Sequence, residues 1–173
     1  MKNTILMTLL FAVFTVCIYM WFVQKSTIAR LDMMADRMTI KQVVDEFSNL
    51  ADSKEIDKQA LLFTENGIVE SFTDGERTSL LQGREQMKTV FSDFLAQFQV
   101  VYHQNGQQTI RLNGDKAEAT SYCRVILINT KGEKPIKTTL YVIYQDQLLK
   151  QNDQWLIEHR QSDFVRREVE TIN

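Results

Sequence analysis

The chain has 173 residues, of which 44% are apolar and 24% charged, which suffices for one globular domain plus a short extra segment but scarcely for two domains. Its formal net charge is -2, and because residues 1–30 carry three basic and no acidic side chains, the remainder carries -5. Binding to nucleic acid depends on neutralising phosphates, so an acidic domain of this kind is a poor candidate for it.

Residues 5–23 form an uncharged apolar stretch near the amino end. A transmembrane helix needs roughly 20 such residues, and aromatic side chains at the outer end of the stretch resemble an interfacial belt. A small-x-small site at 27–29 leaves a cleaved signal peptide as the alternative. We therefore divide the chain into a signal anchor or signal peptide over 1–30 and a folded domain over 31–173. The expected location is the cell membrane, single-pass with the domain outside the cytoplasm, or secreted or periplasmic after cleavage.

Two segments have the apolar spacing of amphipathic helices. Between 34 and 51 the apolar residues recur at helical intervals, and a second such segment follows Gly83. Between these segments, Asp52 and Glu55 have the spacing of a capping box. This spacing predicts a short helix that ends near Phe63 and has Asp52 as its N-cap.

Alternating apolar residues and turn signals predict strands in most of the remaining chain. Asp74-Gly75 and Asn113-Gly114 are favoured hairpin dipeptides. The expected strands are 67–72, 78–81, 100–112, 116–128 and the two arms of a hairpin from 138 to 160, with a loop over 129–135. Helices followed by a meander of strands are typical of an α+β fold, in which the helices cover one face of an antiparallel sheet.

The order of several short motifs resembles the SnoaL-like branch of the NTF2-like superfamily. The motifs are Leu62-Phe63-Thr64-Glu65-Asn66-Gly67, Gly83, His103 at a strand start, Asn113-Gly114-Asp115-Lys116-Ala117, and Tyr144-x-Asp146-x-Leu148 followed by Trp155-x-Ile157. The resemblance covers about residues 36–164. It implies an α+β NTF2-like cone, in which a curved antiparallel sheet packs on two main amphipathic helices around a pocket, here preceded by an apolar leader helix.

A partial likeness to scytalone dehydratase identifies the catalytic candidates. The stretch 51–57 is similar to the dehydratase segment that carries an acid, so Asp52 matches that acid and His103 matches a family histidine. Ala51 stands where the dehydratase has tyrosine. A carboxylate and an imidazole in a water-poor cone suit proton transfer. The alternatives are a helix cap for Asp52 and an ordinary strand-end histidine for His103.

If the pair is functional, Asp52 must approach His103 within hydrogen-bonding distance. Strand periodicity also predicts that His103, Asn105 and Gln107 share one face, since side chains two apart point the same way.

Four residues are the expected substrate-binding side chains: Tyr144 and Asp146, two apart on one strand face, together with Tyr122 and Asn105. Tyr144 is alternatively a core aromatic residue. Asp146 is alternatively the cross-strand partner of Arg124.

The last strand ends in Glu158, His159 and Arg160, which we expect to form a solvated charged edge. No histidine, cysteine or carboxylate spacing suggests a metal site, and no cofactor is expected. Cys17 lies in the leader and Cys123 in a strand, so no disulfide is expected within the domain, and Cys123 is expected to be a buried, inert thiol.

Two functions remain open on these residues. The first is proton transfer of the lyase or isomerase type on a small apolar or aromatic molecule, without a cofactor. The second is a non-catalytic ligand-binding domain or a membrane-tethered assembly scaffold. We also expect a homodimer, because the sheet has more apolar positions than two helices on one face can cover. A nucleic acid partner is not expected.

Overall fold

The computed structural model describes residues 2–131 and 134–172. The chain divides into two compact units, Met1–Asp36 and Arg37–Asn173. Helix α1 (Lys2–Asp52) is continuous, so the leader and the first domain helix expected as separate elements are parts of one helix.

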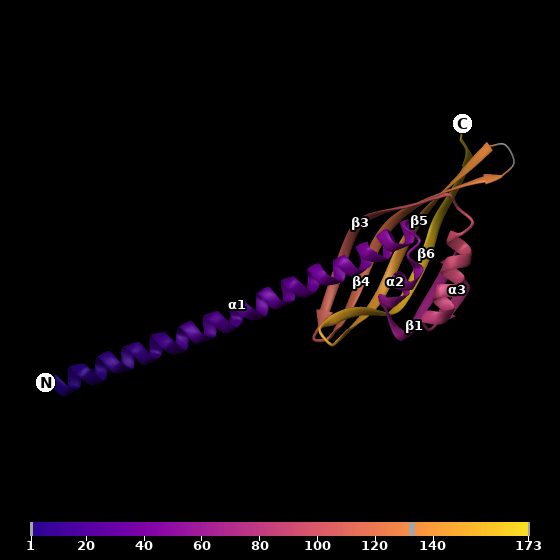
Figure 1. Cartoon of the computed structure of the whole chain (residues 1–173). Coiled ribbons are helices and arrows are strands. Elements are labelled where there is room, and N and C mark those ends of the chain that lie inside the picture. The colour runs from indigo at the N-terminus through magenta and orange to yellow at the C-terminus, as the bar shows by residue number, and fades with distance from the viewer. Residues whose placement is uncertain (1, 132–133, 173) are drawn as a thin grey trace. The chain divides into compact units, whose positions relative to one another are not determined.

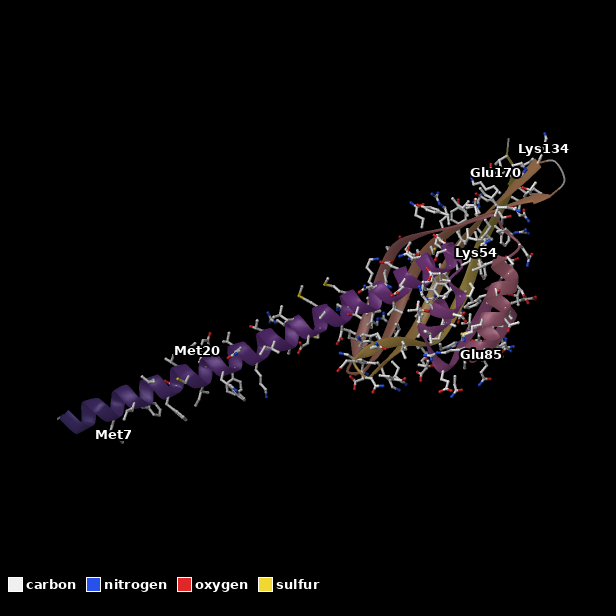
Figure 2. The ribbon with its side chains drawn as sticks, in the orientation of Figure 1. Met7, Met20, Lys54, Glu85, Lys134 and Glu170 are labelled. Carbon is white, nitrogen blue, oxygen red and sulfur yellow. The ribbon has the colours of Figure 1, made fainter. Side chains whose placement is uncertain are left out.

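The first unit consists of the amino-terminal part of α1, along which Met7 and Met20 are labelled in Figure 2. Large apolar side chains along it, such as Phe14 and Trp21, are exposed. The transmembrane anchor expected over 5–23 is not supported, because no helix in the described part of the chain is long and apolar enough to cross a membrane.

The second unit contains one curved sheet of six strands in the order β2-β1-β6-β5-β4-β3 (Figure 1). The strands β3 to β6 form the expected antiparallel meander. However, β1 pairs with β6 in parallel, so the sheet is mixed rather than wholly antiparallel. The strands are β1 (Phe63–Thr73), β2 (Glu76–Gln82), β3 (Val100–Asn113), β4 (Lys116–Lys131), β5 (Lys134–Gln151) and β6 (Gln154–Thr171).

All six strands are longer than the sequence pattern predicts, and β1 already begins at Phe63, where the short helix was expected to end. The loop expected over 129–135 is mostly strand, since β4 and β5 stay paired as far as Lys131 and Lys134, and residues 132 and 133 lie outside the described part. β6 continues to Thr171. Lys134 and Glu170 lie at this extended end of the sheet (Figure 2).

Three helical segments lie beside the sheet (Figure 1). They are the carboxy-terminal end of α1, the short helix α2 (Ile56–Leu61) and the helix α3 (Arg84–Leu95). The second amphipathic helix is confirmed as α3, with Gly83 at its N-cap in a left-handed backbone conformation, φ 82°. Asp52 is not the cap of α2, because Glu55 occupies the N-cap position and no side chain caps the helix. Asp52 is therefore free for another role.

The apolar stripes of the helices form the core with the inner face of the sheet. Ile40 and Phe47 of α1, Met87 of α3 and Phe63 of β1 are all buried. The Phe47 ring meets those of Phe63 and Tyr144 edge to face, with centroids 6.0 and 6.1 Å away. This packing fixes the positions of the side chains that surround the cavity described below.

Two β-bulges reverse the alternation of side chains that the sequence pattern assumes. In β3, Asn105 pairs with Cys123 but the next pair is Gln108 with Ser121, so one extra residue is inserted and Gln107 is exposed instead of facing the helices. The first of two bulges in β6 comes between Ile157 and His159, and it changes which of the residues that follow it face the core.

We expect a chain truncated to residues 31–173 to fold as the full chain does. The buried core begins at Ile40, and every side chain described before Leu31 is exposed, so the deletion removes no described core residue. Circular dichroism melting should give one cooperative transition near that of the full chain. Aggregation or a non-cooperative melt of the truncated protein would contradict this expectation.

Candidate functional site

A cavity of about 380 Å³ lies between the helices and the inner face of the sheet. Its volume falls within the roughly 300–1,000 Å³ common for small-molecule sites. The wall is mostly apolar, with aromatic side chains from α1 and α3 such as Phe47, Phe91 and Phe94. A few polar side chains are set into this wall, among them His103, Gln59 and Arg160.

His103 is held on the cavity wall by Asp52. Its Nδ1 lies 2.6 Å from Asp52 Oδ1, and its backbone N–H donates to the same carboxylate at 3.0 and 3.1 Å. Because an ionised carboxylate can only accept hydrogen bonds, this contact places a hydrogen on Nδ1, and in the neutral form of the ring Nε2 is then the acceptor nitrogen. The expected approach of Asp52 to His103 is thus found.

The fold explains this contact. Strand β3 is at the edge of the sheet, so it has backbone N–H groups without a neighbouring strand. Asp52, the last residue of α1, supplies the acceptor for the N–H of His103. The His103 side chain is only 7% exposed and that of Asp52 25%, so most of the surface of the pair is removed from solvent.

Arg160 was missed by the sequence pattern, which placed it on a solvated edge. It is fully buried, and its Nε and Nη2 donate to the two carboxylate oxygens of Asp146 at 2.7 and 2.8 Å. The bulge at Glu158 moves Arg160 to the core face, directly opposite Asp146 in the β5–β6 register. Arg124, the alternative partner of Asp146, instead donates to Gln104. Burial favours loss of the proton, but the charge and hydrogen bonds of Asp146 outweigh it and raise the pKa of Arg160.

The four expected substrate-binding residues are dispersed. Tyr144 lines the cavity and is 5% exposed, and burial raises the pKa of its phenol well above the usual value. Asp146 is buried behind Arg160. Asn105 connects β3 to α1 through hydrogen bonds with Ser48 and with Asp45. Tyr122 is exposed on the opposite face of the sheet, where the structure places no contact with the cavity.

Cys123 is a free, buried thiol. Burial, partly offset by a hydrogen bond with the backbone of Gln104, raises its pKa to about 11, so it is a poor nucleophile near neutral pH. Among the side chains that the structure describes, no three histidine, cysteine, aspartate or glutamate groups lie where they could hold a metal ion.

His159 belongs to a second cluster of charges and is partly buried, with 29% of its side chain exposed. Its Nε2 lies 2.8 Å from Glu70 Oε2, and Arg77 donates to Glu70 Oε1 at 2.7 Å. The hydrogen bond from Arg77 and then that from His159 hold the pKa of Glu70 below its usual value of 4.5.

Replacing Glu70 by glutamine is expected to lower stability in a pH-dependent way. A folded-state pKa below the unfolded one contributes stability above the unfolded pKa, and the contribution is lost as pH falls through the folded pKa. The melting temperature of the wild type should therefore exceed that of E70Q at about pH 7, and the gap should narrow as the pH falls below about 4. E118Q is the control, since Glu118 is 70% exposed and 4.0 Å from Arg111. A gap that does not change with pH would contradict the assignment.

Comparison with known structures identifies the fold. A candidate scytalone dehydratase from Novosphingobium aromaticivorans matches with a TM-score of 0.68 at 20% identity, over 81% of this chain and 91% of that one. A hexachlorocyclohexane dehydrochlorinase matches with a TM-score of 0.67 at 13% identity, over 83% and 93%. A protein from Kribbella flavida matches with a TM-score of 0.72 at 14% identity, over 79% and 95%. At these identities the likeness shows the fold alone.

No curated protein matches the chain. The model of the SnoaL-like domain matches residues 32–161, which is most of the chain, and neighbours with a cystatin-like fold agree with it. The resemblance read from the order of the motifs is therefore confirmed, and the chain belongs to the SnoaL-like domain family.

Proposed function

We propose that this protein is a lyase or isomerase that removes a proton from a carbon atom of a small, largely apolar molecule. The observation that supports the proposal best is the His103–Asp52 pair on the wall of an apolar cavity, with Nδ1 and Oδ1 2.6 Å apart. In this arrangement His103 is the general base and Asp52 is the positioning residue behind it.

The proton transfer starts from neutral His103. Its Nε2 takes a proton from a substrate carbon, and the electrons of that C–H bond form a double bond to the neighbouring carbon. In a lyase, the bond from that neighbour to a leaving group breaks, and the imidazolium returns its proton to the departing group. In an isomerase, the neighbouring carbon already belongs to a double bond, whose electrons move to the next atom as the new double bond forms, and the imidazolium returns its proton to a carbon at the far end of that conjugated system. Asp52 stabilises the imidazolium that forms between the two steps, because the ionised carboxylate accepts its Nδ1–H.

The cavity supports a compact apolar substrate. A space of roughly 150 Å³ is enough to bind benzene, so about 380 Å³ has room for a molecule with one or two rings. The aromatic side chains around it offer edges and faces to such rings. The names of two structural neighbours, a candidate dehydratase and a dehydrochlorinase, denote eliminations, which agree with the lyase form of the proposal.

Hydrogen–deuterium exchange tests the proposal without knowledge of the natural leaving group. The full chain is incubated in D₂O with a panel of aromatic ketones, including acetophenone and 2-tetralone, and loss of the C–H signals next to the carbonyl is followed by NMR. We expect exchange above the buffer rate for at least one ketone, and loss of that exchange in H103Q. Binding of the ketones without exchange would favour the non-catalytic binding module, and so would exchange that is unchanged in H103Q.

A homodimer stays a prediction. The sheet face that carries Tyr122 also exposes Tyr102 and Val165, and a shallow groove with Tyr141 and Ile143 runs across it. A second copy that covered this face would remove its apolar surface from water. Light scattering of the truncated domain over a range of concentrations should give the mass of a dimer, and a constant monomer mass would contradict the prediction.

The location also stays a prediction: the cell membrane with the domain outside the cytoplasm, or secreted or periplasmic after cleavage. It rests on the apolar sequence over 5–23 alone. Fractionation of cells that express the full chain and the truncated chain measures it. If the full chain and the truncated chain both stay in the cytoplasmic fraction, residues 5–23 neither anchor nor export the protein.

A further inference from the structure

The exposed residues that line the cavity lie on two neighbouring elements. In the described part of the chain they are Thr73 and Thr78, in the hairpin formed by β1 and β2, and Val90 and Phe94 of α3. Val90 is 39% exposed and Phe94 44%. Helix α3 packs beside β1 and β2 (Figure 1). An exposed side chain that also borders the cavity indicates that the cavity reaches solvent beside it, so this distribution points to an opening between α3 and the hairpin.

The other sides of the cavity are closed by the core. Ala51 of α1, Leu127 of β4 and Leu140 of β5 line the cavity and are at most 9% exposed. They belong to one cluster of buried apolar side chains, and such clusters are close-packed. These walls therefore separate the cavity from solvent, which leaves the side between α3 and the hairpin as the way in.

A row of serine hydroxyls leads inward from the same side. Ser79 of β2 pairs with Ser71 of β1, and Ser71 pairs with Ser162 of β6, so the three residues are neighbours across adjacent strands. All three line the cavity, and their hydroxyl groups have no hydrogen-bond partner among the described residues. They are also not among the unpaired side-chain atoms that are fully buried, so they retain contact with the cavity space. Polar groups in such a position are satisfied by water, and a hydrated row that starts at β2 agrees with an opening there.

We propose that Thr78 and Val90, on opposite sides of this opening, form its rim and control the passage of small molecules into and out of the cavity. The assignment goes beyond the proposed function and does not depend on it, since any molecule that binds in the cavity must pass the opening. A bulkier side chain at the rim obstructs a molecule during its passage more than in its bound position. It therefore changes the height of the barrier to entry and exit more than the stability of the complex.

Stopped-flow fluorescence of the full chain with prodan tests the proposal. Prodan is a neutral two-ring probe whose emission responds to the polarity of its surroundings. In ¹⁵N-labelled protein the backbone amide resonances of Val125 and Leu127, on the buried wall, should shift with prodan, which places the probe inside the cavity. In T78W and in V90W we expect association and dissociation both to slow about tenfold. The Kd should change by less than about twofold.

Matched variants separate the opening from general effects of the substitutions. T89W adds the same ring at the next position of α3, which is exposed and does not line the cavity, so its rates should equal those of the wild type. V90A removes bulk from the rim and should accelerate both rates severalfold. Positions 78 and 90 are exposed, so the melting temperatures of these variants should stay close to that of the wild type.

The outcomes separate this inference from the proposed function. Rates in T78W and V90W that equal those of the wild type would overturn the proposal, and so would equal slowing in T89W. A changed Kd at an unchanged association rate would assign the two residues to the bound position rather than to the entrance. Unshifted amides at Val125 and Leu127 would contradict an opening of this size. H103Q should take up prodan at wild-type rates. If passage behaves as expected but no ketone exchanges its protons, the entrance stands and the proton-transfer function fails.

Discussion

Arg160→Ala should lower the free energy of unfolding by about 3–5 kcal/mol, because it leaves the carboxylate of Asp146 charged, buried and without a partner. The side chains of both residues are at most 1% exposed, so bulk water does not reach the pair in the wild-type protein. The variant also leaves a space beside the rings of Phe47 and Tyr144. Urea unfolding monitored by the fluorescence of Trp155, which is 2% exposed, measures the change.

The double variant R160M/D146L is the control for that result. Replacing a buried ion pair as a unit by apolar side chains of similar size is often neutral. Most of the stability lost in R160A should therefore return in the double variant. If R160A unfolds within about 0.5 kcal/mol of the wild type, as a surface substitution does, Arg160 is not part of a closed buried pair in solution.

His103→Gln should lower the rate of proton exchange on a responsive ketone by about 10²–10⁴-fold, the usual contribution of a general base. Glutamine keeps a side-chain N–H that can donate to Asp52, and the backbone N–H of residue 103 still reaches the same carboxylate. The melting temperature should change little. The measurement pairs NMR exchange rates with thermal melting of the same samples.

Asp52→Asn tests whether the charge of Asp52 contributes to the rate of proton exchange by His103. An amide cannot stabilise the imidazolium as a carboxylate does, so the rate should fall while His103 stays in the cavity wall. A large loss of stability in H103Q with no loss of exchange would instead mark His103 as structural.

Local patterns predicted those elements that depend on neighbouring residues. The apolar spacing after Gly83 predicted α3, and Asp74-Gly75 forms the expected turn with both residues at positive φ. The turn after β3 is one residue later than expected, at Gly114 and Asp115, because Asn113 still pairs with Lys116. The order of the meander followed from the turns, since antiparallel neighbours need only short connections.

The site was only partly predictable because its geometry depends on irregularities in the strands. His103 precedes the bulge in β3, so its face was predicted correctly, whereas Gln107 follows that bulge and was misplaced. Arg160 follows the bulge at Glu158 and moved from the predicted edge to the core. A strict two-residue alternation assumes that no residue is inserted, so it assigns the wrong face to the residues that follow a bulge. After the apolar Trp155 and Ile157, the strand continues with the polar residues Arg160 and Ser162. Polar residues usually indicate an exposed strand, but these two are buried.

The parallel pairing of β1 with β6 has a consequence for the order of folding. The hairpins of β3 to β6 pair strands that follow one another in the sequence. In contrast, Ile68 of β1 pairs with His159 of β6, and most of the sequence of the domain lies between these two residues. Contacts between distant segments form late because closing a long loop loses chain entropy before it gains contacts. We therefore expect the meander to form first and β1 to dock last. Because β1 and β2 supply part of its wall, the cavity closes only at that final step, so a ligand that occupies it should slow unfolding without accelerating folding.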